Sequence, residues 1–438
     1  MSNHVLKNAT WIIGCRVLQS VLGLFVGMLT ARYLGPSNYG VINYAAAVVA
    51  FVIPIMQLGF RNTLVHEIIN KPDREGKTVG TALVFNVISA VLCIIGIAVF
   101  AFCANHGEKE TIIVCILYSL SLPFQAIEMI QYWFQSKLLS KYTSIVSIIA
   151  YIVVSAYKVY LLASGKSIYW FALSQMLDFL IISVLLVLIY RKKSSQKMGF
   201  SVSVGRSMLS SSKHYIVSGV MVTTFGYVGS IVLKFFMDSS AVGFYSAAVT
   251  CNGVTAFIYS AIIDSARPSI LESKAKGKDD YENKLKTLYS VIIFIAFMQS
   301  VFMCIFGKYV VGILYGAKYT ASVLPLQIVC WQNVFSFIGT VRNIWILAEG
   351  KQKYLWIINL CGAVFSILLN IVLVYFFSVV GAAIAAVLTQ VFTNVILGFI
   401  IKPISPNNRI MFKSFNPKIL IAYSKSILAS FKPKKAKG

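Results

Sequence analysis

Long apolar runs separated by short polar breaks dominate the pattern of this chain. Twelve runs are long enough to cross a bilayer, whose hydrocarbon core needs about 20 apolar residues in a helix. The runs are continuous and do not alternate, which favours helices over the strands of a barrel. The pattern therefore predicts an all-α polytopic membrane protein of about 12 transmembrane helices. The runs occupy residues 9–31, 38–60, 79–104, 111–135, 142–163, 168–190, 214–237, 244–266, 288–313, 322–348, 355–377 and 381–401.

The segments between the runs predict two lobes of six helices around a central cavity. A long basic segment, 191–213, separates the sixth run from the seventh. We expect an N-terminal lobe over 1–190, a cytoplasmic inter-lobe loop over 191–213, a C-terminal lobe over 214–401 and a basic cytoplasmic tail over 402–438. Within the tail, residues 419–431 are apolar but too few to span, which predicts an interfacial helix on an anionic leaflet.

The two halves resemble each other at equivalent places. Residues 131–142 close the fourth run and residues 343–354 close the tenth, with Trp133 aligned to Trp345. The second run opens near Asn38-Tyr39-Gly40 and the eighth near Val242-Gly243-Phe244. Six runs in each half give both halves the same orientation. We therefore predict parallel repeats about an axis along the membrane normal.

Composition and charge support a membrane protein and fix its orientation. Of 438 residues, 58% are hydrophobic and 12% charged, against about 25% charged in soluble domains. The net charge of +25 could indicate a nucleic-acid partner. However, 30 of the 39 Lys and Arg lie in alternate segments, on the same side as both termini. By the positive-inside rule both termini are cytoplasmic, and we expect no nucleic-acid binding.

Chemical motifs are sparse. The eight cysteines are scattered, without the spacing of a metal site or a disulfide framework. Walker A, GxGxxG and HExxH patterns are missing. The first run is too long for the apolar region of a signal peptide, so we expect it to be retained as an anchor. We therefore expect a transporter with no cofactor rather than an enzyme.

Charged residues within or beside the runs are the candidate functional groups, because a charge in hydrocarbon costs about 2.5–3.5 kcal/mol. Some near run ends could instead reach water, form structural pairs or set topology. The cationic excess predicts a cavity for an anionic ligand, since Arg can bind phosphate through two hydrogen bonds. The acids are candidates for ion coupling or for pairing with a cation. The bases are Arg16, Arg61, Lys158, Lys234, Arg267 and Arg342, and the acids are Glu128, Asp178 and Asp264.

Three segments resemble a known family. Residues 31–40, ARYLGPSNYG, resemble the ARxLGPxxYG signature of the polysaccharide biosynthesis flippases. Residues 242–248, VGFYSAA, resemble that family's VGxYSAA, and residues 314–319, LYGAKY, resemble its LFGxxY. The family belongs to the multidrug/oligosaccharidyl-lipid/polysaccharide exporter superfamily. The resemblance covers about residues 10–400.

This resemblance implies an O-antigen or capsule-type flippase of the bacterial inner membrane. Such a protein moves undecaprenyl-diphosphate-linked oligosaccharide repeat units from the cytoplasmic to the periplasmic leaflet by alternating access. Membrane lipids, a polysaccharide polymerase and chain-length proteins are the implied partners. The only site feature that the resemblance implies is a set of basic residues, here Arg16, Arg61, Lys234 and Arg267. The length and the tail disfavour fourteen-span relatives, including the peptidoglycan-precursor flippase.

Two rival functions remain open. A multidrug exporter of the same superfamily would share the fold, but acids should dominate its cavity. A membrane polymerase or glycosyltransferase of the same pathway should carry a large periplasmic loop. The bases in the runs and the short outer loops favour the flippase over both.

Overall fold

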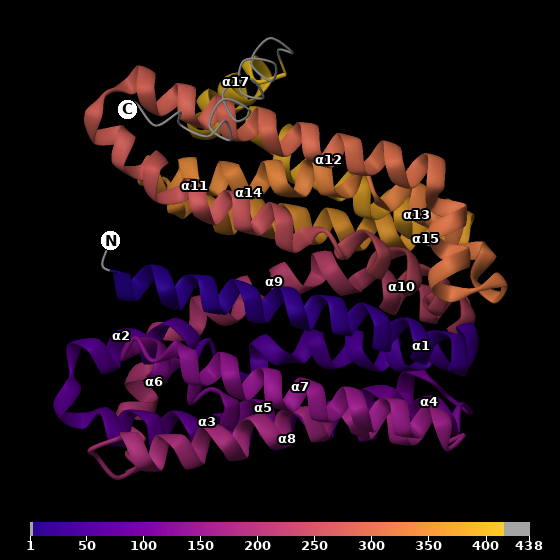
Figure 1. Ribbon diagram of the computed structural model, residues 1–438, viewed down its shortest axis with the longest axis horizontal. Helices are drawn as coiled ribbons and strands as arrows, with labels where there is room; N and C mark the ends of the chain where they lie inside the picture. The colour runs from indigo at the N-terminus through magenta and orange to yellow at the C-terminus, as the bar shows by residue number, and fades with distance from the viewer. Residues whose placement is uncertain (1–2, 416–438) are drawn as a thin grey trace, which may run out of the picture.

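The computed structural model describes residues 3–415, apart from the side chains of 3–18, 20, 21 and 276. Residues 3–415 contain helices and no strand, which confirms the all-α prediction (Figure 1). The first helix set comprises α1 (Asn3–Met56), α2 (Phe60–Asn70), α3 (Glu75–Ala104), α4 (Lys109–Ser119), α5 (Leu122–Glu128), α6 (Gln131–Ser136), α7 (Ser140–Ala163) and α8 (Ile168–Lys193).

The second helix set follows and contains one π-helical turn, η4 (Phe392–Ile396). Its helices are α9 (Val202–Phe236), α10 (Ser239–Gly253), α11 (Ala256–Lys276), α12 (Lys278–Tyr315), α13 (Val323–Val329), α14 (Gln332–Ala348), α15 (Leu355–Val391), α16 (Leu397–Ile400) and α17 (Ser405–Lys413). Short 3₁₀ turns are η1 (Pro72–Arg74), η2 (Ala317–Ser322), η3 (Gln352–Tyr354) and η5 (Lys402–Ile404).

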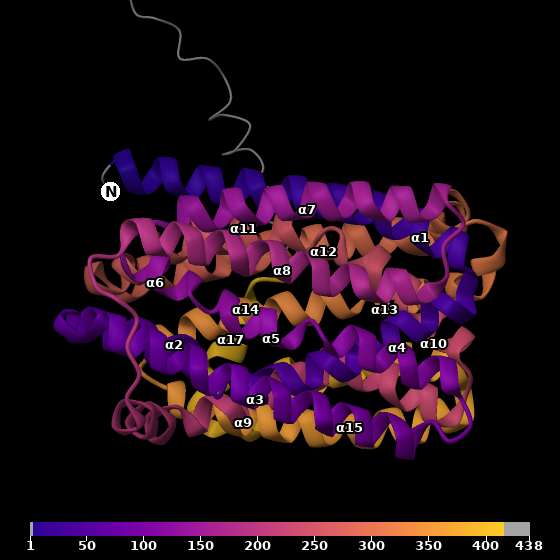
Figure 2. The same cartoon turned by 90° about the horizontal axis from the view of Figure 1, so that it is seen from below.

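The described residues contain nine helical stretches that could cross a membrane, or ten with the bent pair 317–329 and 332–348. The first and the last of the nine each include a non-helical residue, Gly35 (φ 75°) in α1 and Ser378 (φ 52°) in α15. Both views place the N-terminus and α2 at the same end of the molecule, so α1 runs out and returns (Figures 1 and 2). These breaks are consistent with the twelve predicted spans.

The helices lie roughly side by side between two ends of the molecule (Figure 1). We call one the Gly35 end, where the connections are residues 105–108, 164–167 and 237–238 and the breaks are Gly35 and Ser378. The other is the N-terminal end, which holds residue 3, α2 and α17. In Figure 1, α1 to α8 fill the lower half, α10 to α17 fill the upper half, and α9 runs near the middle.

Among the described side chains, the buried hydrophobic cores join helices α10 to α17 to the first helix set at one end only. At the Gly35 end, one core combines Val41 and Tyr44 with Val232 and Val242, and another places Tyr39 among residues of α10, α12 and α15. Toward the N-terminal end, a core of residues 60–208 and a core of residues 259–411 are separate. Among the described side chains, α10 to α17 therefore share buried cores with the first helix set at the Gly35 end, whereas toward the N-terminal end only α9, through Met208, does so.

Several predicted runs are broken helices. The fourth run becomes α4, α5 and α6, with Pro123 in the first turn of α5. The eighth is divided between α10 and α11, and the tenth bends by 42° between α13 and α14. Pro has no backbone N–H and interrupts the ladder of hydrogen bonds, which accounts for the break at Pro123.

The connection between the helix sets is shorter than the predicted loop 191–213, because α8 extends to Lys193 and α9 begins at Val202. Residues 194–201, here called the strap, are held against the first helix set. Gln196 accepts from the Gly76 N–H at 3.1 Å and donates to the Pro72 carbonyl at 2.8 Å. The Gly199 N–H donates to the Gly76 carbonyl at 3.1 Å. The interfacial helix predicted over 419–431 lies outside the described residues.

Candidate functional site

Two glycines bring the helix sets into backbone contact at the Gly35 end. A methyl group on Gly40 of α1 would overlap the carbonyl oxygen of Ser239, at the start of α10. A methyl group on Gly243 of α10 would overlap the carbonyl oxygen of Pro36 in α1. Both contacts need the absence of a Cβ, since no side chain fits where two backbones touch.

Hydrogen bonds reinforce this contact. The Tyr319 hydroxyl donates to the Ala31 carbonyl at 2.9 Å. The Arg32 guanidinium donates to the carbonyls of Leu314, at 2.9 Å, and Ile313, which end α12. Segments that carry the family resemblance, 31–40, 242–248 and 314–319, thus meet here. Together these three segments close the Gly35 end.

Lys234 bridges the helix sets at the same end. Its Nζ lies 2.6 Å from Oε2 of Glu108 and 2.8 Å from Oγ of Ser239. The Lys234 side chain is only 5% exposed, whereas that of Glu108 is 50% exposed. Partial burial alone would raise the pKa of the Glu108 carboxyl, but hydrogen bonds from Lys234 and Thr111 outweigh it and hold that pKa below its ordinary value. Lys234 therefore ties α9 to the connection before α4.

Three predicted site residues gather within the first helix set. Lys158 lies on α7, Asp178 on α8 and Glu128 at the end of α5. The charge of Asp178 acts on both Lys158 and Glu128, although the described residues contain no ion pair within 4.0 Å between them. Asp178 Oδ1 is buried without a hydrogen-bond partner in the described residues. The structure thus places Lys158 with the acids rather than with the other predicted bases.

Arg342 is enclosed within the second helix set. It lies on α14, is 3% exposed, and donates from Nη1 to the Thr393 carbonyl at 2.7 Å. Thr393 belongs to the π-helical turn η4, whose widened spacing leaves backbone groups in need of partners. Arg342 therefore supports η4 from inside the packing.

The remaining predicted bases lie near the N-terminal end. Arg61 of α2 is exposed, and its guanidinium carbon lies 5.7 Å from the ring centroid of Tyr132. On α11, Arg267 pairs with Asp264 at 3.5 Å, and both side chains are largely exposed. The backbone of Arg16 lies in the first arm of α1, but its side chain is outside the described residues.

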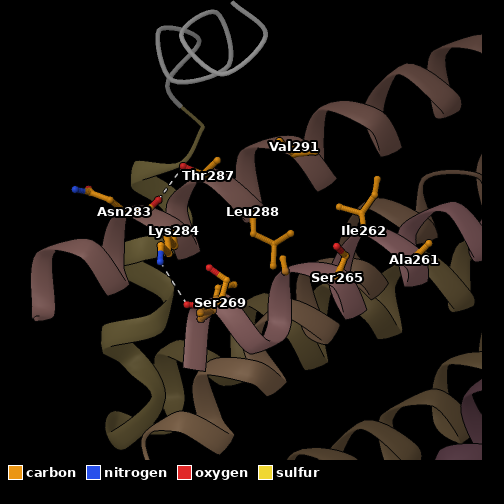
Figure 3. A pocket seen from close by; sticks show the side chains of 11 residues that line it. Ala261, Ile262, Ser265, Ser269, Asn283, Lys284, Thr287, Leu288 and Val291 are labelled. Atoms are coloured by element: carbon orange, nitrogen blue, oxygen red, sulfur yellow. Dashed lines mark hydrogen bonds between the residues drawn. The ribbon is translucent and has the colours of Figure 1, made fainter. Parts of the chain in front are cut away.

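A groove of about 730 Å³ lies between α11 and α12 (Figure 3). Ser269 and Lys284 lie on its two sides near the N-terminal end, and Lys284 Nζ approaches the Ser269 carbonyl at 3.5 Å. Lys284 also pairs with Asp280 at 3.2 Å. The full lining is Ala261, Ile262, Ser265, Ala266, Ser269, Ile270, Asn283, Lys284, Thr287, Leu288 and Val291.

Sequence reasoning missed Glu108 and the groove. Glu108 sits in a short loop without a motif, and its partner Lys234 is 126 positions away. The residues of α11 that line the groove are small or apolar, a pattern that is ordinary for a helix and gives no signal of a groove. The glycine contact had a signal, because Gly40 and Gly243 stand at equivalent places in the predicted repeats.

Comparison with known proteins identifies the family. A family model described as polysaccharide biosynthesis protein matches residues 29–324, more than half of the chain. The chain belongs to this family. The resemblance predicted from residues 31–40, 242–248 and 314–319 is thereby confirmed.

Two curated relatives illustrate the range of similarity. The membrane protein MJ1068 of Methanocaldococcus jannaschii is 25% identical over 223 residues, which are 48% of this chain and 44% of that protein. The chain therefore spans less than half the length of that relative. A putative O-antigen transporter of Escherichia coli K12 is 20% identical over 408 residues, or 90% of this chain and 96% of that protein.

Two solved structures share the fold. The lipid II flippase MurJ in an inward closed conformation matches with a TM-score of 0.75 and 15% identity, over 94% of this chain and 92% of that chain. An inward-facing multidrug resistance transporter of the MATE family matches with a TM-score of 0.64 and 13% identity, over 89% and 96%. At these identities the likeness concerns the fold alone.

Proposed function

We propose that this protein is a flippase for undecaprenyl-diphosphate-linked oligosaccharide repeat units in the bacterial inner membrane. It carries them from the cytoplasmic to the periplasmic leaflet by alternating access. In this proposal the N-terminal end faces the cytoplasm. Family membership and the transporter named among the relatives support a role in transport for polysaccharide assembly. A polysaccharide polymerase and chain-length proteins would act on the exported unit.

The observation that carries the proposal is the uneven joining of the helix sets. Mixed cores and backbone contacts close the Gly35 end, while the cores toward the N-terminal end are separate. A transporter that opens to one side at a time needs one sealed end and one parted end. The arrangement supports a state ready to receive substrate from the N-terminal end.

The exposed bases at that end suit a diphosphate. Arg61 and Arg267 lie in α2 and α11, which continue the second and eighth runs. Arg267 has only an exposed partner, Asp264, and such pairs contribute roughly 0–1 kcal/mol, so a phosphate could replace the carboxylate. We propose Arg16, Arg61 and Arg267 as head-group contacts, and Glu128 and Asp178 with Lys158 as the ion-coupling group.

Gene deletion tests the function. Undecaprenyl-diphosphate-linked sugars would be measured by mass spectrometry together with surface polysaccharide. We expect completed repeat units to accumulate and surface polymer to be lost. Unchanged polymer in a strain with no second flippase would contradict the proposal and favour the drug exporter, which the drug sensitivity of the same strain would reveal.

Point variants then test the head-group contacts. Arg61→Gln and Arg267→Gln should each reduce complementation of the deletion at normal protein levels. Arg206→Gln is the matched control, because Arg206 is an exposed base near the start of α9. Full complementation by both arginine variants would remove these residues from the site.

A further inference from the structure

The groove between α11 and α12 changes in character along its length (Figure 3). Near the turn at Gly277, which joins the two helices, its walls carry Ser269, Asn283, Lys284 and Thr287. Farther from the turn they carry Ala261, Ile262, Leu288 and Val291. The groove therefore has a polar, cationic mouth at the N-terminal end and an apolar interior. A volume of about 730 Å³ is in the usual range for ligand pockets, about 300–1,000 Å³.

We propose that this groove binds the lipid carrier before translocation, as a polyprenyl diphosphate. Its phosphate would sit at the polar mouth, near Lys284, and its first isoprenoid units against the apolar walls. This inference rests on the proposed function and adds to it a docking site distinct from Arg61 and Arg267.

The polar mouth has the groups that a phosphate needs. Lys284 provides a cation whose present partners are the exposed Asp280 carboxylate and the Ser269 carbonyl. Neither contact buries the charge deeply, so an anion can displace them at small cost. The Ser269 hydroxyl is a further donor on the α11 side of the mouth. An ammonium with surrounding hydroxyls binds phosphate through charge-assisted hydrogen bonds.

The apolar part has the shape and place that a lipid tail needs. Ala261, Ser265 and Ala266 of α11 are small, which leaves the room that forms the groove. Leu288 and Val291 of α12 provide the opposite wall. If the N-terminal end faces the cytoplasm, the mouth lies toward the inner-leaflet head groups and the interior toward the hydrocarbon. A membrane amphiphile would enter with the same polarity.

The groove also lies beside the seam between the helix sets. Figure 2 places α11 and α12 toward the same side of the molecule as the first arm of α1, and α1 contacts both helices. Arg267 and Asp264 lie on α11 but do not line the groove. A carrier held in the groove would therefore lie against α11, the helix that also carries Arg267.

Binding to the purified full-length protein in phosphatidylcholine nanodiscs tests the inference. The probes are undecaprenyl diphosphate, phosphatidylglycerol and inorganic pyrophosphate, and bound lipid is measured by native mass spectrometry. We expect Lys284→Gln to weaken binding of undecaprenyl diphosphate about tenfold, the loss typical of one charged contact. Lys286→Gln should bind normally, because Lys286 pairs with Glu282 and does not line the groove.

A second pair of variants tests the apolar part. Ala261→Phe should fill the interior and lower binding of undecaprenyl diphosphate, whereas Ala275→Phe, at an exposed position of the same helix, should not. Melting temperatures confirm that each variant is folded. If Ala261→Phe unfolds the protein, lipid binding by Lys284→Gln still tests the inference.

Three outcomes would overturn the inference. Equal binding of phosphatidylglycerol would make the groove a site for bulk lipid. Binding of pyrophosphate with the same affinity would make it a free-phosphate site. Normal binding by both groove variants would place the carrier elsewhere. None of these results affects the deletion phenotype, so failure of this inference is distinguishable from failure of the flippase proposal.

Discussion

Gly40 and Gly243 make the same contact in opposite directions. Gly40 meets the carbonyl of Ser239, four residues before Gly243, and Gly243 meets the carbonyl of Pro36, four residues before Gly40. Such reciprocity is the property of a two-fold axis between equivalent segments. It agrees with the predicted parallel repeats, because the two glycines stand at matching places in the second and eighth runs.

Substitution at either glycine should open the Gly35 end. We expect Gly40→Ala and Gly243→Ala each to reduce export strongly, because the added methyl would overlap a backbone carbonyl that cannot turn aside. Surface polysaccharide in a complemented deletion strain measures the effect. Gly27→Ala is the control, since its methyl meets nothing within 4 Å and Ala favours a helix by about 1 kcal/mol. Equal export by all three variants would mean that this contact does not limit transport.

Removing Glu108 should cost more stability than removing Lys234. Glu108→Gln leaves the buried Lys234 ammonium with Ser239 as its one remaining partner among the described residues, whereas Lys234→Met leaves a carboxylate that is half exposed and can be hydrated. After allowance for solvent screening, we expect a loss of about 1–2 kcal/mol for Glu108→Gln and less for Lys234→Met. Melting temperatures of the purified variants measure this order, with Glu110→Gln as the control for an exposed acid. The reverse order would argue against this ion pair.

The same pair predicts a dependence on pH. Its carboxyl has a lowered pKa, so its contribution is complete above the ordinary carboxyl pKa and is lost as pH falls through the lowered value. We therefore expect acidification to weaken the wild type more than Glu108→Gln. Melting temperatures from pH 7 down to about pH 3 compare the two proteins. Parallel curves would show that Glu108 does not contribute.

We expect replacement of Arg342 to impair folding before it impairs export. Arg342→Met removes a charged donor and leaves the Thr393 carbonyl without it, so we expect a loss of about 2 kcal/mol and a lower protein level. The interpretation from the sequence, a head-group contact, predicts lost export at a normal protein level after Arg342→Gln. Immunoblots and surface polysaccharide measured together separate the two roles.

Lys158 and Asp178 should behave as a coupled pair. Asp178→Asn and Lys158→Met each leave the opposite charge without its neighbour, whereas the double variant removes both. We expect the double variant to be more stable than the sum of the single effects, as a double-mutant cycle of melting temperatures would show. Strict additivity would mean that the two residues act independently.

The helical architecture followed from hydropathy because lipid forces every span to satisfy its own backbone. Breaks inside the spans were harder to predict. Pro123 was visible in the sequence, whereas Cys330 and Trp331, at the bend between α13 and α14, carry no helix-breaking signal. The strap was read as a loop, because its bonds to Gly76 and Pro72 join residues about 120 positions apart.

The candidate site, like the fold, was only partly predictable from the sequence. The free-energy cost of placing a charge in the membrane identified the charged residues, but it did not show which of them lie close together. Lys234 and Arg342 found partners in Glu108 and Thr393, which no local pattern marks. Arg61 and Arg267 stayed exposed, as residues at the inner ends of runs should. The role of each charged residue depends on its distance from residues far away in the sequence, and a hydropathy pattern does not contain these distances.

Helix α9 is fastened to the first helix set along its whole length, although it opens the second. The strap holds its start, Ser212 Oγ donates to the Leu58 carbonyl at 2.8 Å, and Lys234 binds Glu108 near its end. α9 also packs along α15. If access alternates as proposed, α9 would stay with the first helix set while α10 to α17 move, and residues 237–238, which join α9 to α10, would take up the change in direction.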